Sequence, residues 1–258
     1  MEIVVFALVG VAAGLSAGLF GIGGGLITVP AMIFLLPYFA GVDTHIFHIA
    51  IATSLAAIIP TAIMSSYGHY KKQAIQWSIV IKLAPGLVAG ALCGVFVALY
   101  TSQSILKVVF GFFLLLAAFN MFRSSIHKSV DAFHCQSVNP FTGLIIGVIS
   151  SLMGVGGGTM TVPYLVWKGL NVHQAIACSA FLGLPIALSA TIAFYLARYA
   201  EHELTGGYIY LPALIGISLA AVIVAPLGVK LAHNLPVKIL KKLFSILLIV
   251  VALKIIID

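Results

Sequence analysis

The side chains and backbone groups that could do chemistry in this chain are glycines, hydroxyls and histidines, because no Asp or Glu lies inside an apolar segment. The densest cluster is GLFGIGGGLITVP at 18–30, and GVGGGTMTVP repeats its pattern at 154–163. Glycine and proline interrupt helices, and the helix that follows a break begins with free backbone N–H groups. Together with the helix dipole, these groups can bind an anion without a buried charge. The pattern predicts an anion site built from backbone.

A second duplicated group supplies hydroxyls. Ala52-Thr53-Ser54 and Ala177-Cys178-Ser179 each lie a few residues after a histidine, His48 or His173. The hydroxyls could point at the oxygens of a ligand, but Ser and Thr in membrane helices often bond their own backbone carbonyls, so both interpretations stay open. The two histidines are interpreted as helix-start residues, and proton handling is the alternative.

These two groups define the expected site. The candidate substrate-binding residues are Gly23, Gly24, Gly25, Thr28, Thr53, Ser54, Gly156, Gly157, Gly158, Thr161, Cys178 and Ser179. The glycines could instead serve close packing of membrane helices, but their duplication with a following T-V-P favours a site. There is no HExxH, no metal-ligand spacing and no base at helical depth. We therefore expect no enzyme activity, no cofactor and no metal, and the missing intramembrane carboxylates argue against a cation transporter.

Composition places these residues in a membrane. The 258 residues are 62% hydrophobic and 7% charged, with a mean hydropathy of +1.20, whereas soluble domains carry about 25% charged residues. The net charge of +7 reports topology in such a protein and does not suggest nucleic acid. We expect an all-α polytopic membrane protein in the lipid bilayer.

The sequence contains an internal repeat. Residues 10–30 and 143–163 share 10 identities in 21 positions. The predicted units are a first membrane repeat at 1–122, a polar cytoplasmic linker at 123–140 and a second membrane repeat at 141–258. Each repeat has four apolar segments, at 3–40, 46–67, 77–100 and 105–122, and at 141–166, 174–196, 208–231 and 238–257.

The length of segment 3–40 requires a break. As one helix it would be about 57 Å long, against a hydrocarbon core of about 30 Å. Either the glycines fold it back as a hairpin, or it crosses once and the rest lies along the interface. Since Pro suits a first helical turn and Thr can cap it, the helices after the breaks are predicted to begin near Thr28-Val29-Pro30 and Thr161-Val162-Pro163.

The distribution of Lys and Arg favours the hairpin. If both first segments are hairpins, the repeats are inverted and Lys and Arg divide 10 to 3 between the two sides of the membrane. If both segments cross once, this bias largely vanishes. The positive-inside rule therefore predicts inverted repeats with both termini outside and the broken helices meeting near the midplane.

The duplicated G-x-G-G-G-x-x-T-V-P, followed by A-T-S-L at Ala52 to Leu55, resembles the TauE/SafE sulfite exporter family. The resemblance covers nearly the whole chain. It implies a multi-pass permease of the cytoplasmic (inner) membrane, generally secondary active, for small sulfur-containing anions such as sulfite, thiosulfate or sulfonates. Cys178 departs from the A-T-S pattern, so the two repeats need not contribute equally.

The predicted function is a secondary transporter, most simply an exporter, of sulfite or an organosulfonate. The anion would sit between the two glycine breaks while the halves rock about it in alternating access, and a proton could travel on the substrate. A passive small-anion channel is the alternative. An intramembrane enzyme or a scaffold fits least.

Overall fold

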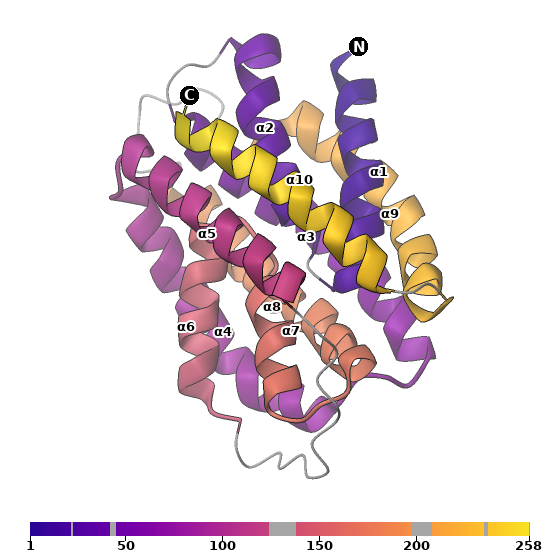
Figure 1. Cartoon of the computed structure of the whole chain (residues 1–258). Coiled ribbons are helices and arrows are strands. Elements are labelled where there is room, and N and C mark those ends of the chain that lie inside the picture. Colours follow the sequence, from indigo (N-terminus) through magenta and orange to yellow (C-terminus); the bar gives the residue numbers. More distant parts are fainter. Residues whose placement is uncertain (22, 42–44, 124–137, 198–207, 235–236, 258) are drawn as a thin grey trace.

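The computed structural model describes residues 1–21, 23–41, 45–123, 138–197, 208–234 and 237–257. These residues form helices and no strand (Figure 1). The helices are α1 (Glu2–Phe20), α2 (Gly25–Ala40), α3 (Ile46–Lys71), α4 (Trp77–Leu99), α5 (Gln103–Arg123), α6 (Pro140–Leu152), α7 (Gly158–Trp167), α8 (Val172–Ala197), α9 (Leu211–Asn234) and α10 (Val237–Ile257). Among the described residues, α1, α3, α4, α5, α8 and α9 are long and apolar enough to cross a membrane. The all-α polytopic class is confirmed.

Both first segments are broken at the glycines, as predicted. Helix α1 ends where Gly21 adopts φ 66°, and the Gly21 N–H donates to the carbonyl oxygen of Ala17 at 2.9 Å. Helices α2 and α7 follow Gly24 and Gly157, which both have φ 80°. Side chains other than hydrogen rarely tolerate this left-handed conformation, so glycine is required at these turns.

The predicted starts of the second helices are wrong. Helices α2 and α7 begin at Gly25 and Gly158, about one turn before the Thr-Val-Pro stretches. The capping position is a left-handed glycine, and no threonine caps either helix. Pro30 and Pro163 consequently lie inside the helices, where each removes one backbone donor.

The helices of the two predicted repeats pack across the repeat boundary. Helix α1 packs along α9, α6 along α4, α3 along α8, and α5 along α10. Glycines lie in two of these contacts: Gly14 lies against the backbone of Ala221 in α9, and Gly90 lies against the backbone of Leu144 in α6. Such contacts let helix backbones approach closely, which is how membrane helices associate.

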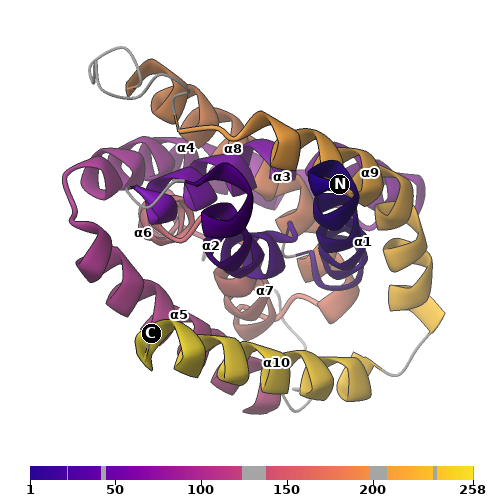
Figure 2. The ribbon, with the colours of Figure 1, turned by 90° about the horizontal axis from the view of Figure 1, so that it is seen from above.

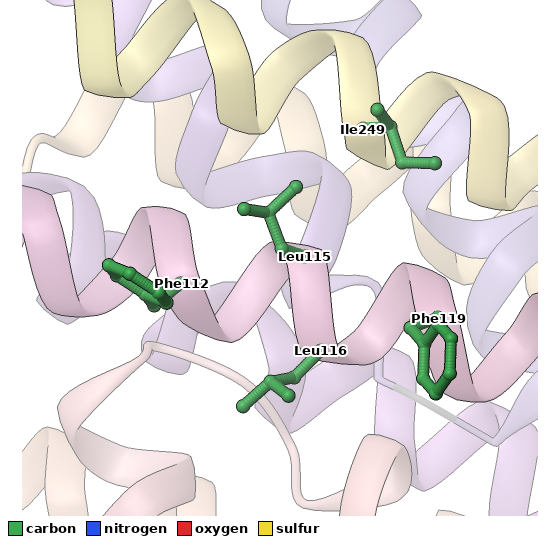
Figure 3. Close-up of a pocket in the computed structure, with 5 residues that line it drawn as sticks. All are labelled: Phe112, Leu115, Leu116, Phe119 and Ile249. Atoms are coloured by element: carbon green, nitrogen blue, oxygen red, sulfur yellow. The ribbon is translucent and has the colours of Figure 1, made fainter.

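Helices α5 and α10 form an outer layer that crosses one face of the bundle diagonally (Figures 1 and 2). A groove of about 520 Å³ on this layer is lined by Phe112, Leu115, Leu116, Phe119 and Ile249 (Figure 3). All five side chains are apolar, so this groove suits lipid tails and cannot bind an anion.

The broken helices lie toward opposite ends of the bundle. Helices α1 and α2 occupy the upper part of Figure 1, together with both chain termini, and α6 and α7 occupy the lower part. The boundaries of the predicted repeats remain a prediction, and most of the expected linker, 124–137, lies outside the described residues.

Candidate functional site

The two glycine breaks touch each other in the middle of the bundle. A methyl group added at Gly23 would lie 3.3 Å from the Cα of Gly156 and 3.2 Å from a side-chain carbon of Ile58 in α3. Gly25 lies against the carbonyl oxygen of Gly154, and an added methyl would lie 2.9 Å from the Cα of Val155. The fold therefore brings together the two glycine clusters that the sequence singled out.

Each break is held by a serine from the other predicted repeat. The Ser54 hydroxyl in α3 donates to the carbonyl oxygen of Gly154 at 2.8 Å. The Ser179 hydroxyl in α8 donates to the carbonyl oxygen of Gly21 at 3.2 Å. Carbonyls at a helix end have no partner in the helix, so the serines satisfy groups that the breaks create. Both hydroxyl protons are thus used by the backbone.

Thr53 and Cys178 make one equivalent contact in the two halves of the bundle. The Thr53 hydroxyl accepts from the N–H of Tyr210, the residue before α9, at 2.9 Å. The Cys178 sulfur accepts from the N–H of Gln76, the residue before α4, at 3.2 Å. Sulfur is a weak acceptor, but it keeps the contact. The replacement of Thr by Cys in the A-T-S pattern of the second half therefore preserves the hydrogen bond to the residue before the next helix.

The two threonines after the breaks differ. The Thr28 hydroxyl donates to the carbonyl oxygen of Gly24, within its own first turn, at 3.2 Å. The Thr161 hydroxyl is buried and has no hydrogen-bond partner among the described residues. The sequence repeat predicts the same role for Thr28 and Thr161, but in the structure their hydroxyls differ in hydrogen bonding.

The backbone N–H groups at the break before α7 are available. Among the described residues, the N–H groups of Gly156, Gly157 and Gly158 make no hydrogen bond, and the turn hydrogen bonds of α7 start with Met160 and Thr161 bonding back to Gly157. These N–H groups lie at the positive end of the α7 dipole. Binding of an anion by these groups stays a prediction.

Sequence reasoning missed Ser150, whose hydroxyl is also buried without a described partner. It lies one turn before the α6 break, and a methyl group added at Gly157 would lie 3.5 Å from it. The residue at the matching place of the first repeat is Ala17, so a search for duplicated residues passes over Ser150.

The predicted helix-start histidines lie where expected, in the first turns of α3 and α8. The Nε2 of His48 lies 3.0 Å from the carbonyl oxygen of Ala98, to which it can donate, and its ring packs near those of His45 and Tyr208. This contact ties α3 to the end of α4. Proton handling by His48 or His173 stays a prediction.

Removing either bracing serine should destabilise the protein. Ser54→Ala or Ser179→Ala leaves a buried carbonyl oxygen without its partner, which costs about 1–3 kcal/mol. Ser151→Ala is the matched control, because the Ser151 hydroxyl bonds the Val148 carbonyl oxygen within its own helix. Thermal unfolding of detergent-purified protein measures the difference. Equal midpoints for all three variants would mean that the serine contacts do not stabilise the breaks.

The fold and the two contacting breaks define an integral membrane protein of helices interrupted at its centre. The model of the family described as "Sulfite exporter TauE/SafE" matches residues 6–255. Similar proteins include a "Probable membrane transporter protein" of Haemophilus influenzae, 36% identical over 95% of both chains. A "Probable membrane transporter protein" of Methanocaldococcus jannaschii is 29% identical over 93% of this chain and 90% of its own. No solved structure matches.

The chain belongs to the TauE/SafE family. Its family and its relatives are named as membrane transporters, and this protein is a membrane transporter and not an enzyme.

Proposed function

We propose that this transporter is a secondary carrier of a small sulfur-containing oxyanion, such as sulfite or an organosulfonate, and that it works as an exporter. The observation that supports this most is the contact between the two breaks, where backbone N–H groups of Gly156, Gly157 and Gly158 have no described acceptor. Such groups match the oxygens of an anion. The family description names sulfite, which agrees with this chemistry.

Transport by alternating access follows if the two repeats are inverted about the breaks. The placement of α1 and α2 toward one end and of α6 and α7 toward the other supports the inversion (Figure 1). The moving units would then contain helices of both repeats, because α1 is in backbone contact with α9, and α4 with α6. The start of α1 and the end of α10 lie toward the same end of the bundle (Figure 1), which supports the proposed location of both termini outside the inner membrane.

Flux into proteoliposomes tests the proposal. Purified protein should carry sulfite, thiosulfate or a simple sulfonate saturably, whereas acetate and phosphate should move as slowly as in empty vesicles. An imposed pH gradient should accelerate the flux if a proton travels on the substrate. Flux of none of the sulfur anions through folded protein would refute the proposed substrate class.

Counterflow distinguishes a carrier from the alternative, a passive small-anion channel. A carrier accelerates uptake when unlabelled substrate is loaded on the opposite side. A channel shows no such stimulation and conducts current without saturating at low flux. The dense packing of backbone against backbone at the breaks favours the carrier.

A further inference from the structure

The two breaks are alike in backbone but differ in the side chains around them. The capping glycines Gly24 and Gly157 both have φ 80°. A methyl group at Gly24 would meet the backbone oxygen and the methyl of Ala13 at 2.9 Å and 3.0 Å. The first break is therefore closed by neighbouring backbone and an alanine.

At the second break, two hydroxyls face the capping glycine. A methyl group at Gly157 would lie 3.4 Å from the Thr161 hydroxyl oxygen and 3.5 Å from that of Ser150. Ser150 comes from α6, before the break, and Thr161 from α7, after it. The two hydroxyls thus converge on one point, next to the N–H groups at the start of α7 that have no partner in the described part of the chain.

Both hydroxyls are buried and unpaired. Ser150 and Thr161 are each 1% exposed, and neither oxygen has a hydrogen-bond partner among the described residues. A buried polar group without a partner is costly, so such a group normally meets a ligand, an ion or a water. The equivalent positions of the first repeat offer no free hydroxyl, since Ala17 has none and Thr28 bonds the Gly24 carbonyl oxygen.

We propose that the transported oxyanion binds at the second break, and that Ser150 and Thr161 donate their hydroxyl protons to its oxygens. This inference rests on the proposed function and deepens it by assigning the substrate contacts to one repeat. The N–H groups of Gly157 and Gly158 would bind the remaining oxygens. Ser54 and Ser179 brace the breaks and do not touch the substrate.

The test is sulfite binding to detergent-purified protein by calorimetry, together with the KM for sulfite in proteoliposomes. Ser150→Ala and Thr161→Val should each weaken binding and raise KM roughly 10- to 100-fold, because hydrogen bonds to a charged group are stronger than neutral ones. The maximal rate should change less than KM. Thr161→Val keeps the shape of the side chain, so this variant tests the proposal if Ser150→Ala does not fold.

Two controls remove hydroxyls that the backbone already uses. Ser151→Ala deletes the buried neighbour of Ser150, and Thr28→Val deletes the counterpart of Thr161. Both should leave the affinity unchanged. If folded Ser150→Ala and Thr161→Val bind sulfite as the wild type does, water pairs these hydroxyls and the inference is wrong. If the wild type itself neither binds nor carries a sulfur anion, the proposed function is what fails.

Discussion

Gly157→Ala should lower the transport efficiency of sulfite by roughly 100-fold or more, because the added methyl occupies the point on which two proposed substrate contacts converge. The methyl would lie within 3.5 Å of the hydroxyl oxygens of Ser150 and Thr161. It would also meet the terminal methyl of Ile186 at 2.7 Å, and this flexible side-chain end can move aside. We therefore expect folded protein with a blocked site, measured as flux in proteoliposomes.

Gly41→Ala is the matched control for this substitution. Gly41 has φ 59°, so alanine carries a similar left-handed strain of roughly 1–2 kcal/mol there. No described atom lies within 4 Å of the added methyl. This variant therefore reports the effect of backbone strain without obstruction of the proposed binding site. Gly41→Ala should be destabilised like Gly157→Ala but transport normally. Equal transport by both variants would place the anion elsewhere.

Gly14→Ala and Gly90→Ala should each destabilise the fold by about 1–3 kcal/mol, as overpacking does. A methyl at Gly14 would lie 2.6 Å from the carbonyl oxygen of Ala221 and 2.7 Å from its Cα. A methyl at Gly90 would overlap the carbonyl oxygen of Leu144. Backbone cannot move aside as a side chain can, so α1 must separate from α9, and α4 from α6. Thermal unfolding of purified protein measures the loss.

Gly68→Ala provides the comparison. Its methyl would meet side-chain carbons of Val229 in α9, the nearest at 3.2 Å, and no backbone. Alanine also favours a helix over glycine by about 1 kcal/mol, so this variant should be as stable as the wild type or more so. A similar loss of thermal stability in Gly68→Ala would show that any methyl added against α9 destabilises the protein. The close backbone contacts of Gly14 and Gly90 would then not explain the loss.

The helices are predictable from the sequence where a long apolar run ends in polar residues. Segments 46–67 and 77–100 are α3 and α4 with small differences at their ends. The breaks are predictable too, because three adjacent glycines in an apolar run are hard to reconcile with an unbroken helix. The predicted start of α2 is wrong because Pro30 suits a first helical turn, whereas Gly24 takes the capping conformation and begins the helix earlier.

The roles of individual hydroxyls could not be predicted, because they depend on contacts between the repeats. Ser54 and Ser179 look like ligands in sequence, yet each bonds a carbonyl at least 100 residues away in the chain. Thr28 and Thr161 look equivalent, and only their surroundings distinguish them. Ser150 has no counterpart to mark it. Repetition in the sequence thus identifies the breaks, and the asymmetry around them appears only in three dimensions.

The pairing of α1 with α9 has a consequence for how the protein is made. Gly14 and Ala221 lie roughly 200 residues apart, and ribosomes add about 5–20 residues per second. Helix α9 is therefore synthesised roughly 10–40 s after α1. Helices α4 and α6 meet much sooner, because Gly90 and Leu144 are closer in the chain. Until α9 is made, the glycine face of α1 therefore lacks the partner that it packs against in the folded protein. The pairing of α4 with α6 can form before the pairing of α1 with α9.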